Sequence, residues 1–218
     1  MRDSRKGKDY FNAYLDYQYS RIQKKTAKLK ECDASKKQRV LLSLVGYETD
    51  LLKAEFSVGA SNDTLKTLLT SAIDIAKEYD NITYDDLLLL VSLSVSLGVE
   101  NDAKKLVKKN SLIIEKDRLL KYLATYIENG KAVWDVNVSL SKEYKLLDEV
   151  FSSADKEKAL LKYLDNWYIN HSEYAWYDSH KKDTDTYCGY WSFETPAIMK
   201  IAGITSDVVN KSEFMPIF

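Results

Sequence analysis

The stretch Thr83-Tyr-Asp-Asp-Leu-Leu-Leu-Leu-Val-Ser-Leu-Ser-Val-Ser-Leu-Gly98 decides the fold class. Asp86 follows Thr83 by three residues, a spacing similar to that of the capping box at the start of a helix. The residues from Leu87 to Leu97 are apolar nearly all round, and Gly98 is a typical helix terminator. This run is too short to span a bilayer. It therefore predicts the most buried helix of a globular protein.

Three long helices are predicted before this stretch. The first carries apolar residues spaced by four and seven along one stripe of about seven turns. One serine can cap the second helix, and another serine can cap the third helix. A glycine ends the second helix. The residues concerned are the stripe Phe11, Leu15, Ile22 and Leu29, the caps Ser35 and Ser61, and the terminator Gly59.

Further helices are predicted toward the C-terminus. A proline inside the last of them implies a kink or a fresh start, because proline has no backbone N–H to donate. The segment 129–138 has the weakest pattern and is expected to be a loop. The predicted helices span 101–109, 111–128, 139–152, 154–169 after the cap Ser153, 172–180, and 187–202 with Pro196.

The composition favours helices over sheets. The chain of 218 residues has only 7 glycines and 2 prolines, whereas a sheet protein with many tight turns needs more of both. The sequence thus predicts an all-α fold, in which antiparallel helical hairpins pack into one elongated or globular helical array. A weak change of composition near 80–83 predicts an N-terminal helical domain at 1–82 and a C-terminal helical domain at 83–218.

The net charge of −1 conceals an asymmetry. Residues 1–40 contain 12 Lys or Arg and 5 Asp or Glu, which leaves 20 basic and 28 acidic residues for the rest of the chain. Two interpretations are open: the first helix has a solvated basic face, or the acidic remainder faces a basic partner. The basic residues accompany no recognition motif, so direct binding of nucleic acid is not expected.

Two features bear on the compartment. Cys32 and Cys188 are far apart and lack the spacing of a metal or redox site, which is typical of free thiols in a reducing cytoplasm. The charged N-terminus leads into an amphipathic stretch without an apolar signal region. A cytoplasmic protein without a membrane segment is therefore expected.

Catalytic and metal-binding patterns are weak. Cys188 and His180 could form a nucleophile and base, but eight residues of polar chain do not hold them together. Asp178 with His180, or His171 with Glu173, could ligate a metal, but neither pair has the i, i+4 spacing of helical ligands. No glycine-rich phosphate loop is present. We expect no catalytic residue, no metal and no cofactor.

The C-terminal quarter is unusually aromatic, and it contains both histidines of the chain. Rings at helical spacing, such as Trp167 and Trp191, are more often core than surface. Trp176 and Tyr177 instead stand in a short segment among charges, where aromatic rings are typical of a binding hot spot. Both a packed core and a recognition surface remain open for this segment.

The same region resembles a known family. The motifs Leu160-Leu-Lys-Tyr-Leu-Asp-Asn-Trp-Tyr168, Trp176-Tyr-Asp-Ser-His-Lys181 and Gly189-Tyr-Trp-Ser-Phe-Glu194 are similar to the C-terminal domain of the PoNi immunity proteins. Met1-Arg-Asp, Asp9-Tyr-Phe and Phe56-Ser-Val-Gly-Ala-Ser look like the N-terminal domain of that family, and Leu87-Leu-Leu-Leu-Val-Ser-Leu like the opening of its C-terminal domain. The chain departs from the family at Thr195-Pro196, where alanines are usual, and in the tail 214–218, which lacks the usual acidic, Tyr-Pro-rich ending.

The resemblance implies an inhibitor rather than an enzyme. PoNi proteins are cytoplasmic antidotes to PoNe-type DNase toxins of bacterial competition systems, so the implied partner is a cognate nuclease toxin. The resemblance implies no role for a membrane and leaves the oligomeric state open. A helical adaptor without a nuclease partner and an enzyme acting on a small molecule are the alternatives.

A nuclease must present a basic site to grip DNA, so an inhibitor that covers it should offer carboxylates framed by aromatic rings. On this reasoning Asp165 and Glu194 are candidates for buried groups that hold the fold instead. The expected partner-binding residues are Glu173, Trp176, Tyr177, Asp178, His180, Asp183 and Asp185, and the expected structural residues are Trp167, Tyr168, Tyr190, Trp191 and Glu194.

Overall fold

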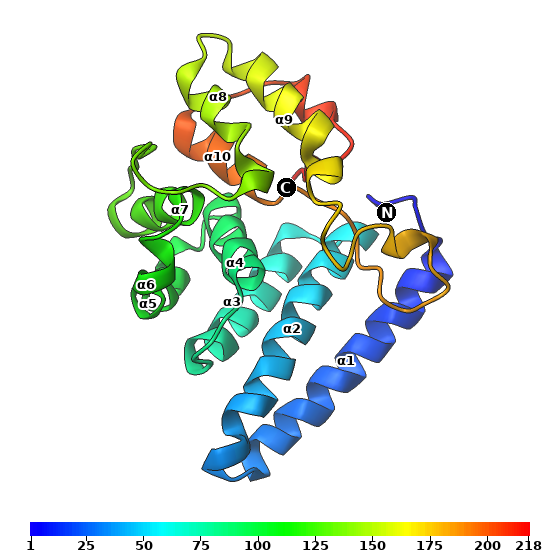
Figure 1. The fold of residues 1–218 in the computed structure, drawn as a ribbon. Helices are drawn as coiled ribbons and strands as arrows, with labels where there is room; N and C mark the ends of the chain where they lie inside the picture. Colours follow the sequence, from blue (N-terminus) through cyan, green and yellow to red (C-terminus); the bar gives the residue numbers. More distant parts are fainter. The chain divides into compact units, whose positions relative to one another are not determined.

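A computed structural model describes residues 1–218, and all its regular elements are α-helices or short 3-10 helices (Figure 1). The predicted all-α fold is confirmed. None of the helices is both long and apolar enough to cross a membrane. The elements are α1 Lys8–Glu31, α2 Ala34–Val58, α3 Asn62–Glu78, α4 Tyr84–Leu97, α5 Glu100–Lys109, α6 Ser111–Ile114, α7 Arg118–Asn129, η1 Lys142–Tyr144, α8 Leu147–Ser152, α9 Lys156–Asn170, η2 Ser179–Lys181, α10 Glu194–Ala202 and η3 Val209–Lys211.

The chain forms two compact units. Unit 1 consists of Met1–Leu90 together with Asp178–Gly189, and unit 2 of Val91–Tyr177 together with Tyr190–Phe218. Each unit therefore includes a piece of the C-terminal quarter. The division into sequence domains 1–82 and 83–218 stays a prediction.

In unit 1, α1 and α2 run antiparallel as a helical hairpin, and α3 packs on α2 (Figure 1). The buried face of α1 consists of Phe11, Tyr14 and Gln18. The predicted stripe is wrong beyond Phe11, because Leu15, Ile22 and Leu29 are only half-buried. The aromatic body of Tyr14, rather than the aliphatic side chain beside it, faces inward.

The helix ends in unit 1 follow local chemistry. Ser61 caps α3 by accepting a hydrogen bond from the Thr64 amide at 3.2 Å. Gly59 ends α2 with a φ of 99°, a conformation that residues with a Cβ avoid. Both predictions are confirmed. Ser35 is not the cap of α2, however, because the helix begins one residue earlier and Asp33 occupies the N-cap position.

The helix α4 is the best predicted element. The Thr83 hydroxyl accepts from the Asp86 amide at 3.1 Å, as an N-cap does, and donates to the Asp86 carboxylate at 2.7 Å, whereas in a capping box that carboxylate would accept from the Thr83 backbone amide. Every side chain from Leu87 to Val95 is buried, and Gly98 follows with a φ of 73°. The helix begins in unit 1 and ends in unit 2.

Unit 2 is built from shorter helices, with α5 and α10 packed on α7 and α8 packed on α9. The predicted helix 111–128 breaks at Asp117, whose carboxylate caps α7 by accepting from the Leu120 amide at 2.9 Å. Asp155, not Ser153, caps α9 in the same way, through the Lys158 amide. Carboxylates compete with serine for N-cap positions, which explains both errors. The predicted loop is confirmed over 130–138, since α7 runs to Asn129.

Three other predicted helices are shorter or absent. Residues 139–152 form only η1 and α8. Residues 172–180 form turns and the start of η2, and Asp178, with a φ of 59°, lies outside the helical region of backbone conformation. In the range 187–202 the helix starts only at Glu194. The Ser192 amide before it donates to the Phe214 carbonyl at 2.9 Å, so its hydrogen bond goes to the tail.

Candidate functional site

The C-terminal end of α9 carries an aromatic cluster in unit 2. Trp176 stacks on Trp167 with ring centroids 5.6 Å apart, and Tyr177 stacks on Tyr168 at 4.3 Å. Turns after α9 bring these rings back onto the helix. Trp176 and Tyr177 are half-buried, so they are neither fully core nor freely exposed. The members of this cluster are Trp167, Tyr168, His171, Trp176, Tyr177, Tyr190 and Phe214.

The carboxylate of Glu194 lies beneath the aromatic cluster and is only 5 % exposed. It accepts hydrogen bonds from the Trp167 indole at 2.8 Å and from the hydroxyls of Tyr163 and Ser192. Two donors from α9 and one from the segment just before α10 satisfy the buried carboxylate, and they tie α9 to the start of α10. Asp165, also expected to be buried, is exposed, because it lies on the outer face of α9.

The remaining residues expected to be structural differ in exposure. Trp167 and Tyr190 are buried, whereas Tyr168 and Trp191 are half-buried. The Tyr190 hydroxyl donates to the Trp176 carbonyl at 3.2 Å, so it also holds the turn that carries the candidate aromatic residues.

Glu173 lies on the surface of unit 2, where it forms an ion pair with Lys142. The Lys142 ammonium lowers the pKa of the Glu173 carboxyl through a hydrogen bond and by charge. Lys142 also neutralises much of the negative charge that Glu173 would show to a partner. Glu173 therefore contributes less field than an unpaired carboxylate would.

The other expected partner-binding residues belong to unit 1. We call residues 178–186 the acidic loop. Its first part is compact, because Asp178 adopts the left-handed conformation and pairs with Lys181 at 2.9 Å. His180 lies with its ring centroid 5.9 Å from that of Tyr187. Burial and the nearby Lys181 charge lower the pKa of His180, so its imidazole is neutral at pH 7.

Asp183 and Asp185 form the outer part of the acidic loop. Both side chains are exposed, and neither takes part in a salt bridge. Thr184 and Thr186 between and after them share a hydroxyl hydrogen bond of 2.9 Å. The loop thus presents two exposed carboxylates, two residues apart, that take part in no salt bridge.

The acidic loop is anchored to the N-terminus. The Lys6 ammonium donates to the Lys182 carbonyl at 3.3 Å. The Tyr10 hydroxyl accepts from the Tyr187 amide at 2.9 Å and donates to the Tyr187 carbonyl at 3.0 Å. The Tyr187 hydroxyl in turn donates to the buried Asp3 carboxylate. We call Asp3, Tyr10 and Tyr187 the clamp.

The clamp itself rests on the end of α2. The backbone amides of Arg2 and Asp3 both donate to the Ser57 carbonyl, at 2.8 and 3.0 Å. The Ser57 hydroxyl donates to the Cys188 carbonyl at 2.9 Å. Residue-by-residue reasoning missed the clamp. Its only signal was that Asp3 and Tyr10 stand in the N-terminal motifs quoted above, which carry no chemistry by themselves.

The cysteine considered as a nucleophile lies in an unfavourable setting. The Cys188 thiol is 3.9 Å from the Asp50 carboxylate, and burial together with this charge raises the pKa of Cys188 to about 12. Nucleophilic cysteines need the opposite shift, because the thiolate is the reactive form. The Nδ1 atom of His171 forms a hydrogen bond with the Trp167 carbonyl at 2.6 Å.

Two family models match the chain. The model of the N-terminal part of the PoNe immunity protein (PoNi) matches residues 2–108, and that of the C-terminal part of the PoNe immunity proteins matches residues 115–217. No curated protein and no solved structure gives a significant match. Since the two models together leave only the chain ends and a short gap uncovered, the chain belongs to the PoNi family of PoNe immunity proteins.

Proposed function

We propose that this protein binds a cognate PoNe-type DNase toxin in the cytoplasm and inhibits it by covering the basic site that grips DNA. Membership of an immunity family implies a toxin partner. A nuclease site must be positively charged to hold a phosphate backbone, so a complementary surface has to be negative. The observation that carries the proposal is the pair of exposed, unpaired carboxylates of Asp183 and Asp185 on an anchored loop.

The anchoring supports a binding role because it lowers the entropy lost on association. A loop that is already held at Lys182 and at Tyr187 has fewer conformations to give up when a partner binds. The carboxylates of Asp183 and Asp185 then occupy the positions on the toxin at which successive phosphate groups of DNA would bind. Asp178 and His180 belong to the compact part of the same loop, and we assign them to the edge of the surface that binds the toxin.

In unit 2, Glu173, Trp176 and Tyr177 form a separate region that we also propose to contact the toxin. Half-buried rings that stack on neighbours are rigid and offer apolar contact area with little loss of side-chain entropy. We assign the apolar contacts to Trp176 and Tyr177. We assign the electrostatic steering of the toxin to the acidic loop. Steering by charge mainly raises the association rate, and salt weakens it.

Co-expression with a PoNe-type toxin from the same locus tests the proposal. The variant Asp183→Lys/Asp185→Lys should lose protection, and its association rate with purified toxin should fall at least about tenfold at low salt. The matched control is Glu128→Lys/Asp207→Lys, which makes the same change of net charge at exposed carboxylates outside the proposed surface. This control should protect as the wild type does.

Two outcomes separate the function from the site. Full protection by the Asp183→Lys/Asp185→Lys variant would refute the assigned surface and leave the immunity role intact. Failure of the wild type to protect against any toxin of its locus, combined with normal folding, would instead favour a helical adaptor without a nuclease partner.

A further inference from the structure

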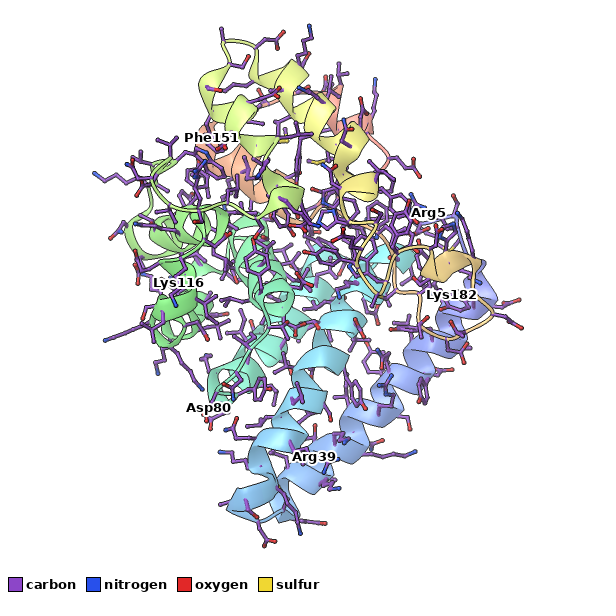
Figure 2. All side chains as sticks on the ribbon, in the orientation of Figure 1. Arg5, Arg39, Asp80, Lys116, Phe151 and Lys182 are labelled. Atoms are coloured by element: carbon purple, nitrogen blue, oxygen red, sulfur yellow. The ribbon has the colours of Figure 1, made fainter.

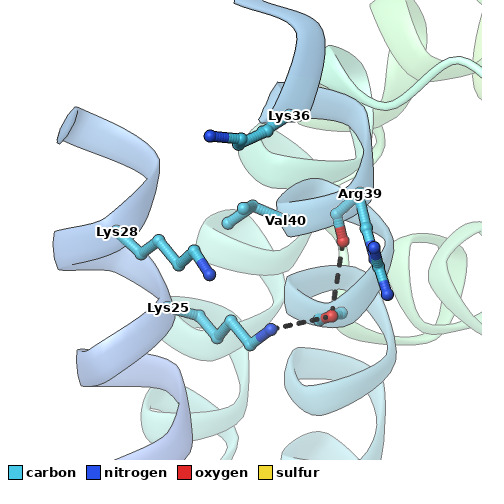
Figure 3. A pocket seen from close by; sticks show the side chains of 6 residues that line it. Lys25, Lys28, Lys36, Arg39 and Val40 are labelled. Atoms are coloured by element: carbon cyan, nitrogen blue, oxygen red, sulfur yellow. Dashed lines mark hydrogen bonds between the residues drawn. The ribbon is translucent and has the colours of Figure 1, made fainter. Parts of the chain in front are cut away.

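A basic groove lies in unit 1 between the C-terminal half of α1 and the N-terminal half of α2 (Figure 3). Its volume is about 520 Å³, which is in the range of small-molecule sites. The residues that line it are Lys25, Lys28, Lys36, Arg39, Val40 and Ser43. The groove therefore combines a ligand-sized hollow with four positive side chains.

The positive charges are poorly compensated from within the protein. Lys28 extends from α1 toward α2, and Lys36 extends from α2 toward the side of α1 (Figure 3); Lys28 has no salt bridge. Lys36 pairs only with Asp33 at 3.4 Å, and both side chains of that pair are largely exposed, so the pair is weak. Like charges gathered in one hollow repel each other, and a bound anion removes that repulsion.

Hydrogen bonds hold one side of the groove in place. The Lys25 ammonium donates to the Ser43 hydroxyl at 3.2 Å, and the Ser43 hydroxyl donates to the Arg39 carbonyl at 3.4 Å (Figure 3). This chain ties Lys25 of α1 to the wall formed by α2. A ligand would therefore meet at least one ammonium group that is already oriented.

The lining indicates the class of ligand. Ammonium groups are compact point charges suited to phosphate oxygens, and several of them together suit several adjacent phosphates. The lining contains no aromatic ring on which a base could stack. We propose that this groove binds a small anion with contiguous phosphate groups, either a free polyphosphate or the phosphate chain of a nucleotide, and recognises only the phosphates.

The groove is separate from the acidic loop. Along α1, Tyr10 of the clamp and Lys28 of the groove are about 27 Å apart at the helical rise. Arg39 accordingly lies toward the opposite end of the helical hairpin from Arg5 and Lys182 (Figure 2). This separation allows unit 1 to bind an anion in the groove without obstructing the acidic loop.

Titration of the whole protein with tripolyphosphate, ATP and adenosine, followed by calorimetry, tests the inference. Tripolyphosphate and ATP should bind with similar affinity, and adenosine should not bind. Added salt should weaken the binding of both anions. The variant Lys28→Gln/Lys36→Gln should bind tripolyphosphate with about tenfold lower affinity than the wild type. The control Lys104→Gln/Lys105→Gln removes two exposed charges from α5 and should leave the affinity unchanged.

Several results would overturn the inference. They are the absence of tripolyphosphate binding at millimolar concentration, an equal loss of affinity in the α5 control, and a preference of tenfold or more for ATP over tripolyphosphate. Tighter binding of an oligoglutamate peptide than of tripolyphosphate would also overturn it, because the groove would then suit an acidic protein segment. Circular dichroism of both double variants checks that they remain folded.

Discussion

The hydroxyl of Tyr187 hydrogen-bonds the carboxylate of Asp3 across 184 residues of sequence. Asp3 is 1 % exposed and Tyr187 is fully buried, so water cannot replace either partner. Arg5 completes the arrangement, since its guanidinium lies 3.2 Å from the Asp3 carboxylate. The hydrogen bond joins the start of the chain to the end of the acidic loop. We infer that the N-terminal tail positions the carboxylates proposed to meet the toxin.

Tyr187→Phe should therefore loosen the acidic loop while its ring still fills the same space. Loss of one hydrogen bond to a buried carboxylate should lower the free energy of unfolding by about 1–2 kcal/mol. Hydrogen exchange of the amides in residues 181–189 should accelerate more than exchange in α3. The control Tyr17→Phe removes a hydroxyl from an exposed tyrosine and should change neither quantity. Unchanged exchange in Tyr187→Phe would show that the clamp does not restrain the loop.

Glu194→Ala should be the most damaging single change in unit 2. It leaves the Trp167 indole and the hydroxyls of Tyr163 and Ser192 without their common acceptor. Because buried donors without partners are costly, we expect a loss of about 3 kcal/mol or more in urea denaturation followed by tryptophan fluorescence. Asp165→Ala, at an exposed carboxylate, should stay within about 0.5 kcal/mol of the wild type. Similar losses in both variants would contradict the central role of Glu194.

The two acidic residues also show what the sequence could and could not predict. Asp165 and Glu194 both stand among aromatic and apolar residues, and the sequence suggested that both are buried. Only Glu194 has donors from other segments within reach, and no local pattern reveals that. By contrast, the cap and the apolar run of α4 are local features, so that helix was predicted with its correct ends.

The segment 172–180 was misjudged for a related reason. Its residue types allow a helix, but its backbone follows distant partners. The Trp176 carbonyl accepts from the Tyr190 hydroxyl, and the ring of Trp176 stacks on Trp167. Those contacts outweigh helix propensity, which amounts to less than about 1 kcal/mol per residue. The clamp was missed as well, because it joins residues at opposite ends of the chain.

Cys188 should react slowly with alkylating reagents. With its pKa raised to about 12, the thiolate fraction at pH 7.5 is on the order of a thousandfold below that of an ordinary thiol. In the Cys32→Ser variant, iodoacetamide should therefore modify Cys188 on the order of a thousandfold more slowly in the native state than in urea. Fast native alkylation that depends on His180 would contradict this prediction and would support the alternative of a cysteine enzyme.

Glu48 should make unit 1 less stable as the pH rises toward neutrality. Burial raises the pKa of the Glu48 carboxyl, and the Ser71 hydroxyl at 3.4 Å only partly opposes that shift. A raised pKa in the folded state means that the stabilising form is the protonated one. That stability is complete below the ordinary glutamate pKa of about 4.3 and is lost as the pH rises through the raised value.

The variant Glu48→Gln removes this titration and keeps an acceptor for Ser71. Its free energy of unfolding, measured by urea denaturation, should exceed that of the wild type at pH 7. The difference should shrink steadily as the pH falls toward 4.5, because the wild-type carboxyl then becomes neutral in the folded state as well. A difference that stays constant between pH 4.5 and 7 would mean that Glu48 does not titrate differently in the folded and unfolded states, and its burial would then need another explanation.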